Sequence, residues 1–448
     1  MSDEKTEVVE QPVAAETPVS GPEVSEAPEP EAAPAPEPEA APAPEPEAPA
    51  PVVRRQSVVM RTGSCDMRVG TGALDQLGNA ARIAAGKPSR ALLVSGCDVD
   101  AELTERCRRL LVDAGFAVSL TTVPAGRTAR SFENVTTLYE TLAAEHVTAD
   151  DPIVVVGDAD VISLAVFAGA TWHTGCPVVA AATTLDAVID VTVTPRAIDA
   201  PGAPNMLVAR GNARFMIADP SVFVSHELTN AELMGRATMV AGAVAAGENS
   251  FNELAVRADG VIDAAEDTLV AAILDITKAR ARVVSSSALA MRQGILYGQA
   301  IGRALERALE LQQADPSRYL VDENPGSARL FAEGLRIAAR LAAAKQAPDD
   351  KLVDFVFTQD GLLEKLGLAE VACLIDPQVL LDCLKAEEFS RSNRFMLALP
   401  LGFGRVRLTS VPDEMLLEHL SGWCKSRRKL ARRRAREVAA QQGVQESN

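Results

Sequence analysis

The sequence predicts an α/β fold in which an N-terminal, Rossmann-like parallel-sheet domain is followed by a mostly α-helical C-terminal domain. Two observations predict it. Between residues 54 and 228, short apolar runs rich in β-branched residues alternate with helical segments, an order typical of parallel sheets covered on both faces. From 229 to 424, apolar residues instead recur about every 3.6 positions, as on helices with one buried face.

The first half contains five clear strand patterns. They are SVVMRT at 57–62, SRALLVSG at 89–96, FAVSLTTV at 116–123, DPIVVVGD at 151–158 and PVVAAAT at 177–183. Helices are expected between them at 98–115, 131–147 and 159–172, the first capped by Asp98 or Asp100 and ended by Gly115. Ligands of parallel sheets bind beyond the carboxyl ends of the strands, so the loops at Gly96, Gly157 and Thr183 form the expected binding edge.

The second half is dominated by helical periodicity. It covers residues 229–247, 260–313, 327–346, 350–368 and 376–389. A strand pair is expected at 394–411, followed by a final helix. The expected organisation is therefore an arm at 1–53, an α/β domain at 54–228, a mostly α-helical domain at 229–424 and a tail at 425–448.

The two ends of the chain carry opposite charge. Residues 1–53 hold thirteen acidic residues against one Lys, as well as thirteen of the 27 Pro. Such a segment buries little apolar surface and predicts a disordered acidic arm, either a solubilising linker or an arm that docks onto a partner. Residues 425–436 hold eight basic residues, which favours a solvated helix, with docking onto a polyanion as the alternative.

Composition narrows the class of protein. No run of eighteen apolar residues is present, and the acidic N-terminus is unlike a signal peptide, so we expect a cytoplasmic protein without membrane contact. Seven Cys without a CxxC pair predict reduced thiols, and four scattered His provide no His-x3-His metal clip. Aromatic residues make up 4%, too few to favour a stacking surface for nucleic acid, although the basic tail leaves that question open.

Five segments, in this order, resemble the 3-dehydroquinate synthase family of sugar-phosphate cyclases. They are DDPIVVVGDADVISLAVFAGATW, PVVAAATTLDAVIDVTVTPR, ARFMIADPSVF, GLLEKLGLAEVACLIDPQVLLDCL and MLALPLGFGRVRLTSVPDEMLLEHL. The second is similar to the family's PTTLLAQVDSSVGGK, and the last to its LPxGIGKVxL and VPxELLxxAL. The resemblance covers residues 58–422. It implies that 54–228 is a nucleotide-binding-like domain and that 229–424 is a metal- and substrate-type domain.

The resemblance implies a reaction and its cofactors. Family members convert 3-deoxy-arabino-heptulosonate 7-phosphate to 3-dehydroquinate and phosphate in the shikimate pathway, on the way to aromatic amino acids. This is a lyase reaction in which NAD transiently oxidises the substrate. A divalent metal, Zn²⁺ or Co²⁺, is held by one Glu and two His and polarises the reacting oxygen. Lys and Arg side chains grip a sugar-phosphate ligand, and many members are homodimers.

The family's metal ligands are replaced in this chain. Thr238 stands where a Glu ligand is expected, Ile295 and Phe331 stand where the two His ligands are expected, and Gln299 replaces a further active-site His. A hydroxyl, an aliphatic and an aromatic side chain do not hold such an ion. Glu333 survives beside Phe331, while Ala241 stands in place of a Lys. We therefore predict no metal site.

The glycine loop of the family is also altered. Its GGGVVGD reads Gly157-Asp158-Ala159-Asp160-Val161-Ile162-Ser163 in this chain, with one glycine and two carboxylates where a pyrophosphate is expected. Carboxylates in that position repel a phosphate. The alternative interpretation is that Asp158 and Asp160 cap the following helix.

Other family positions are retained, and the resemblance assigns roles to them. Those implied as cofactor-binding are Thr183, Thr184, Leu185, Gly157 and Arg130; those implied as catalytic are Asp190, Arg196 and Asn205. The alternatives are strand-end hydrogen bonding for the two threonines and a surface charge for Arg196. Pro204 stands in place of one family Lys, and Glu387-Glu388-Phe389 replaces the family's DKK. A position that is positively charged in the family is therefore negatively charged in this chain.

Three hypotheses follow. The replaced ligands favour a non-catalytic relative that keeps the fold for binding or regulation. The alternatives are an active 3-dehydroquinate synthase with a rearranged site, and a divergent cyclase that acts on another phosphorylated sugar.

Overall fold

The structure is a computed structural model that describes residues 52–225, 227–313, 325–346, 350–388 and 394–445. The described residues belong to one compact unit. The predicted arm at 1–53 lies outside the described residues apart from its last two, and so does Phe389. The predicted α/β-plus-helical fold is confirmed, and the change in character expected at 228 falls between the short helix α5, Pro220–Phe223, and helix α6, Asn230–Ala246.

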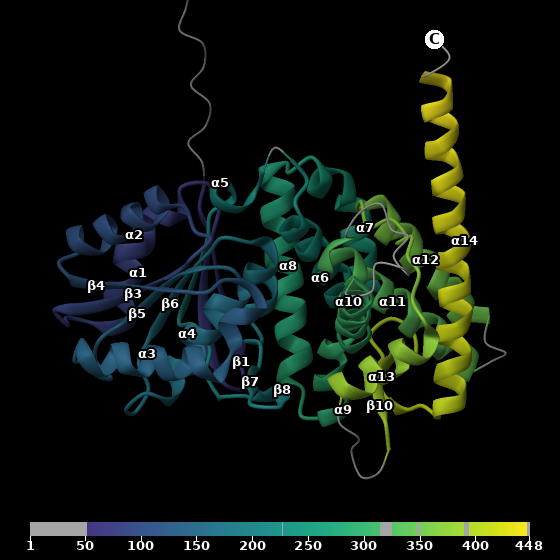
Figure 1. The fold of residues 1–448 in the computed structure, drawn as a ribbon. Helices are drawn as coiled ribbons and strands as arrows, with labels where there is room; N and C mark the ends of the chain where they lie inside the picture. The colour runs from purple at the N-terminus through teal and green to yellow at the C-terminus, as the bar shows by residue number, and fades with distance from the viewer. Residues whose placement is uncertain (1–51, 226, 314–324, 347–349, 389–393, 446–448) are drawn as a thin grey trace, which may run out of the picture. The chain divides into compact units, whose positions relative to one another are not determined.

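A seven-stranded sheet forms the first half (Figure 1). Its order is β1-β2-β9-β6-β5-β3-β4, and neighbours are parallel except for the antiparallel pair β1–β2. The strands span Arg54–Met60 (β1), Gly63–Val69 (β2), Arg90–Gly96 (β3), Ala117–Val123 (β4), Ile153–Gly157 (β5), Val178–Ala182 (β6) and Phe215–Ala218 (β9). The five predicted strands are present; β2, β9 and a small hairpin of β7, Ile198–Ala200, and β8, Ala203–Leu207, were not predicted.

Helices cover both faces of this sheet, as the unbroken apolar strands predict. They are α1 (Leu77–Ala85), α2 (Ala101–Asp113), α3 (Phe132–Ala144) and α4 (Ala159–Thr171). Successive strand residues point to opposite faces: Val154 and Val156 pack with α1 and α2, whereas Ile153 and Val155 pack with α3 and α4. Asp100 caps α2 by accepting a hydrogen bond from the amide of Glu102.

In the described part of the second half, the elements are helices and one hairpin. Its elements after α6 are α7 (Glu248–Ile262), α8 (Glu266–Ser285), α9 (Leu289–Arg292), α10 (Gln299–Gln313), α11 (Gly326–Lys345), α12 (Asp350–Lys365), α13 (Pro377–Glu387), β10 (Met396–Pro400), β11 (Val406–Ser410) and α14 (Asp413–Gln445). The predicted helical stretch 260–313 is interrupted between α7 and α8 and between α8 and α9. It is interrupted again by the 3-10 helix Gln293–Leu296 (η4) and by Gly298, whose φ of 75° ends helical geometry before α10.

Helix α14 runs without a break from Asp413 to Gln445. The boundary expected between 424 and 425 therefore lies inside this helix. All seven cysteines are free thiols, and across the described ranges we find no helix with the length and apolar character needed to cross a bilayer.

Candidate functional site

Gly157 and Thr183, two of the three positions of the predicted binding edge, lie beside each other where β5 and β6 end. Gly157 closes β5, and its carbonyl accepts a hydrogen bond of 3.0 Å from the amide of Thr183, directly after β6. A Cβ on Gly157 would lie 2.7 Å from the Cγ1 of Val161. A larger residue would therefore push the first turn of α4 away from the strand.

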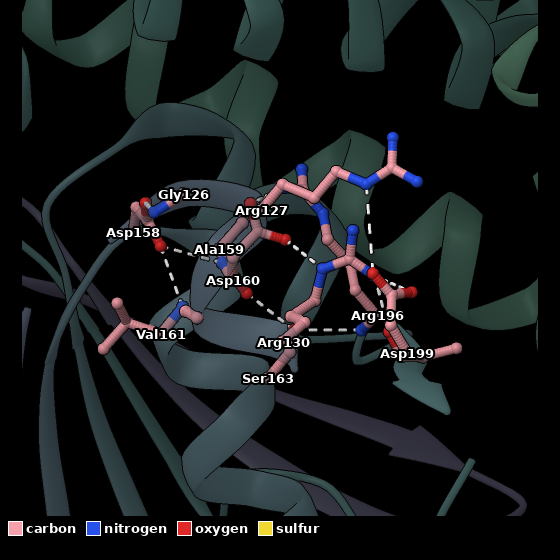
Figure 2. A network of polar contacts seen from close by, with 12 residues as sticks. Gly126, Arg127, Arg130, Asp158, Ala159, Asp160, Val161, Ser163, Arg196 and Asp199 are labelled. Carbon is pink, nitrogen blue, oxygen red and sulfur yellow. Dashed lines mark hydrogen bonds and ion pairs between the residues drawn. The ribbon is translucent and has the colours of Figure 1, made fainter. Parts of the chain in front are cut away.

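The N-terminus of α4 is occupied by the carboxylate of Asp158 (Figure 2). Its Oδ1 accepts hydrogen bonds from the amides of Asp160 at 2.9 Å and Val161 at 2.8 Å, and its Oδ2 accepts one from the amide of Gly126 at 2.7 Å. Unpaired amides at a helix N-terminus attract anions. The chain thus places its own anion where an α/β fold would bind a phosphate, and the capping interpretation of Asp158 is confirmed.

We expect the two oxygens of Asp158 to contribute separately to stability. Removing the cap and the Gly126 bond with Asp158→Ala is expected to lower the free energy of unfolding by about 2 kcal/mol. Asp158→Asn keeps one accepting oxygen for the helix amides and should lose about half as much. Urea denaturation measures both. Equal stability of both variants and the unmodified chain would show that the carboxylate contributes nothing there.

Asp160 does not cap the helix, so that part of the capping interpretation is wrong. Its Oδ1 lies 2.5 Å from the Nε of Arg130 and its Oδ2 lies 3.1 Å from an Nη of Arg196. Burial raises the pKa of the Asp160 carboxyl, but the charges of Arg196 and Arg130 outweigh it and lower the pKa below its usual value. Asp160 is therefore held ionised between two guanidinium groups.

Arg196 is the centre of the polar network. One Nη lies 2.6 Å from Asp186 and its Nε lies 3.4 Å from Asp190, in addition to the pair with Asp160. Burial lowers the pKa of the Arg196 guanidinium, but the three carboxylates raise it well above its usual value. The surface-charge interpretation of Arg196 is wrong, because its guanidinium forms ion pairs with three aspartates of the chain.

Arg280 completes the network from the helical half. It extends from α8, is only 1% exposed, and pairs with Asp190. Burial and the charge of Arg196 lower the pKa of Arg280, although Asp190 acts in the other direction. Three arginines, Arg130, Arg196 and Arg280, thus face three aspartates, Asp160, Asp186 and Asp190.

The backbone around Asp190 has an unusual conformation. Residues Ala187–Val191 form a π-helical turn (η3) that starts directly after Asp186. Single π-turns are frequent at functional sites. Here the turn presents the Asp190 carboxylate to Arg196 on one side and Arg280 on the other.

Asn205 lies on the hairpin beside Arg130. It accepts a hydrogen bond of 2.9 Å from Arg130 through its side-chain oxygen, while its backbone φ is 58°. Asn205 Nδ2 and the hydroxyl of Thr184 are buried and have no hydrogen-bond partner within the described residues. Leu185 is buried in the core. The structure therefore brings Arg130, Asp190, Arg196 and Asn205 together and places Thr184 at the end of the neighbouring strand.

A second cluster joins the two halves of the chain through Glu387. Its carboxylate lies 3.4 Å from Arg127 of the 3-10 helix Gly126–Arg130 (η2) and 3.0 Å from Arg303 of α10. Arg127 also lies 3.9 Å from Asp199 (Figure 2). The resemblance aligns Glu387 with the Asp of the family's DKK. The next position, where a Lys is implied, holds Glu388, which lies 3.4 Å from Arg303.

The positions of the family's metal ligands hold buried side chains without suitable donor groups. Thr238, Ile295 and Phe331 belong to α6, η4 and α11 and contribute to the core of the helical half. In the part of the chain that the structure describes, no group of three His, Cys, Asp or Glu side chains could hold a metal ion. These residues do not fit a divalent ion.

Glu333 is the one acid kept in the metal-ligand motifs, and its contacts are structural. It is fully buried and accepts hydrogen bonds from the indole of Trp423 at 2.7 Å and the amide of Val371 at 3.0 Å. Arg336 and Arg427 lie 3.5 Å from its two oxygens. Glu333 thus joins α11 to α14.

Comparison with known proteins identifies the family. Residues 120–233 match the family model of the 3-dehydroquinate synthase N-terminal domain. The 3-dehydroquinate synthase of Caulobacter vibrioides is 30% identical over 267 residues, which cover 59% of this chain and 72% of the relative. That of Symbiobacterium thermophilum is 27% identical over 350 residues, covering 77% and 93%. The chain belongs to the 3-dehydroquinate synthase family.

Solved structures support the same fold. A 2-deoxy-scyllo-inosose synthase complexed with carbaglucose-6-phosphate, NAD⁺ and Co²⁺ aligns with a TM-score of 0.67 and 16% identity, over 82% of this chain and 99% of that one. A 2-epi-5-epi-valiolone synthase from Streptomyces hygroscopicus with NAD⁺ and Zn²⁺ bound aligns with a TM-score of 0.63 and 15% identity, over 82% and 99%. Fold, however, does not carry activity unless the site residues are present.

Proposed function

We propose that this chain is a non-catalytic member of the 3-dehydroquinate synthase family that keeps the fold for binding or regulation, as a scaffold or partner of shikimate-pathway enzymes. One observation carries the proposal: Arg130, Arg196 and Arg280 are neutralised by the chain's own aspartates. The family substrate has a phosphate and a carboxylate, and both need cations that are free to bind them.

The carboxylates of Asp158 and Asp160 disfavour the binding of NAD. Asp158 already accepts from the amides at the start of α4 that a pyrophosphate would need. A phosphate placed there would also face Asp160 in a partly desolvated environment, where like charges repel strongly. Breaking a buried ion pair to admit a ligand leaves an uncompensated charge, which costs about 3–5 kcal/mol.

A turnover assay tests the proposal. The purified chain is incubated with 3-deoxy-arabino-heptulosonate 7-phosphate, NAD⁺ and Zn²⁺ or Co²⁺, and released phosphate is measured beside the Caulobacter vibrioides enzyme as positive control. We expect no release above the protein-free blank, with or without added metal. Metal-dependent release that a chelator abolishes would refute the proposal.

An active, divergent cyclase is the second candidate function. It is favoured by the polar atoms that the site leaves unpaired, Thr184 Oγ1 and Asn205 Nδ2, because a ligand hydroxyl could bind them. The same assay with other phosphorylated sugars separates the two candidates. Phosphate release that is insensitive to chelator and lost in Asn205→Ala would favour the divergent enzyme.

A further inference from the structure

The C-terminal part of α14 carries a one-sided row of cations that the proposed function does not use. Lys425, Arg428, Lys429, Arg432 and Arg436 are all exposed. Each of them lies three or four residues from at least one other member, which places the five on one face of the helix. We call these five residues the basic stripe.

Other cations of the same helix are occupied, which distinguishes them from the stripe. Arg427 lies 2.6 Å from Glu370, Arg434 donates to the Glu370 carbonyl at 3.1 Å, and Arg433 lies 3.6 Å from Glu437. The first two contacts hold α14 against the rest of the helical half. No member of the basic stripe has an ion pair with any residue that the structure describes.

The stripe borders a hollow on the surface. Lys429, Arg432 and Arg436, together with Arg433 and Glu437, line a depression of about 430 Å³. Four cations thus surround one acid. The apolar residues among 425–437 are limited to Leu430, Ala431 and Ala435, whereas a helix that lies in a membrane surface needs a broad apolar face.

We propose that the basic stripe binds the phosphate backbone of a nucleic acid duplex without reading its sequence. An α-helix is about 10–12 Å wide and fits the major groove of a duplex, which is about 12 Å wide. Duplex DNA carries one negative charge per about 1.7 Å of its axis, a density that a dense row of cations matches. Arg, which predominates in the stripe, binds phosphate with two parallel hydrogen bonds.

Fluorescence anisotropy with the full chain and a labelled DNA duplex of about 20 base pairs tests this proposal. Five phosphate contacts predict a slope of log K against log salt of about −4.5, so that affinity should fall roughly 500-fold between about 50 and 200 mM salt. Lys429→Glu/Arg432→Glu should abolish binding, or reduce the slope by about two units where binding persists.

A matched control is available on α2. Arg108→Glu/Arg109→Glu reverses the same number of surface charges away from the stripe and should leave binding unchanged. Circular dichroism verifies that each variant is folded. The proposal is overturned when the stripe variant binds like the control, when poly-glutamate competes as well as unlabelled duplex, or when only vesicles of anionic lipid bind.

Discussion

Replacing Arg196 by Met is expected to lower the free energy of unfolding by about 3–5 kcal/mol at pH 7, because it leaves Asp160, Asp186 and Asp190 with too few positive charges. Breaking a buried ion pair on one side is among the most costly single changes in a protein. Arg196→Lys keeps the charge but not the forked geometry, and should cost roughly 1–2 kcal/mol. Urea denaturation monitored by circular dichroism measures both variants.

The pH dependence of this loss has a predicted sign. In the unmodified chain the pKa of Asp160 is lowered in the folded state, so its contribution is present above the unfolded pKa and is lost as pH falls through the folded value. Arg196→Met removes the cation that lowers the pKa of Asp160 most. The loss of unfolding free energy caused by Arg196→Met should therefore be largest at pH 7 and decrease toward pH 4.

An exposed pair provides the control for this experiment. Arg108 pairs with Glu105 at 2.7 Å on the surface of α2, where solvent screens the charges. Arg108→Met should leave the unfolding transition unchanged at both pH values. If Arg196→Met loses no more unfolding free energy than Arg108→Met, the network does not stabilise the fold.

Glu333→Ala is expected to cause a loss of similar size, about 3–5 kcal/mol, for a different reason. Its carboxylate is fully buried, and its removal takes the nearest buried negative charge from Arg336 and Arg427 and leaves the indole N–H of Trp423 without its acceptor. Arg427 keeps its pair with Glu370, and Arg336 keeps its hydrogen bond to the Leu368 carbonyl. The contacts between α11 and α14 should loosen first, and we expect lower near-ultraviolet ellipticity of the folded variant together with the shifted urea transition.

Trp423→Phe is the matched variant for this site. It removes one donor and keeps most of the apolar volume, so we expect a loss of about 1–2 kcal/mol. Glu333→Gln keeps an acceptor but not the charge and should lie between the two. Equal stability of Glu333→Ala and Trp423→Phe would show that the two arginines do not depend on the Glu333 charge.

Much of the fold could be predicted because its signals are local. The buried strand at 151–158 and the amphipathic helix at 98–115 are each recognised from residue period and caps. Strand β2, with Asp66 and Arg68 inside it, lacks that pattern; the pairs of Asp66 with Arg55 and Arg68 stabilise these charges in the sheet. The break at Gly298 was missed because apolar periodicity continues across it.

The site was harder to predict because its members pair over long sequence distances. The family resemblance pointed to Arg130, Asp190 and Arg196 but not to their pairing. Asp160 and Arg130 are 30 residues apart, and Asp190 and Arg280 are 90 apart. One local signal for Arg280 existed. It falls on the apolar stripe of α8 with Ile273 and Ile276, and a charge on such a face needs a buried partner.

Calorimetric titration with NAD⁺ in the presence of Zn²⁺ tests the central claim, that the chain's own carboxylates occupy the anion-binding positions of the cyclase fold. We predict no binding heat at millimolar NAD⁺ and no metal retained after gel filtration, with the Caulobacter vibrioides enzyme as positive control. Saturable binding of one NAD⁺ and one zinc per chain would contradict the claim.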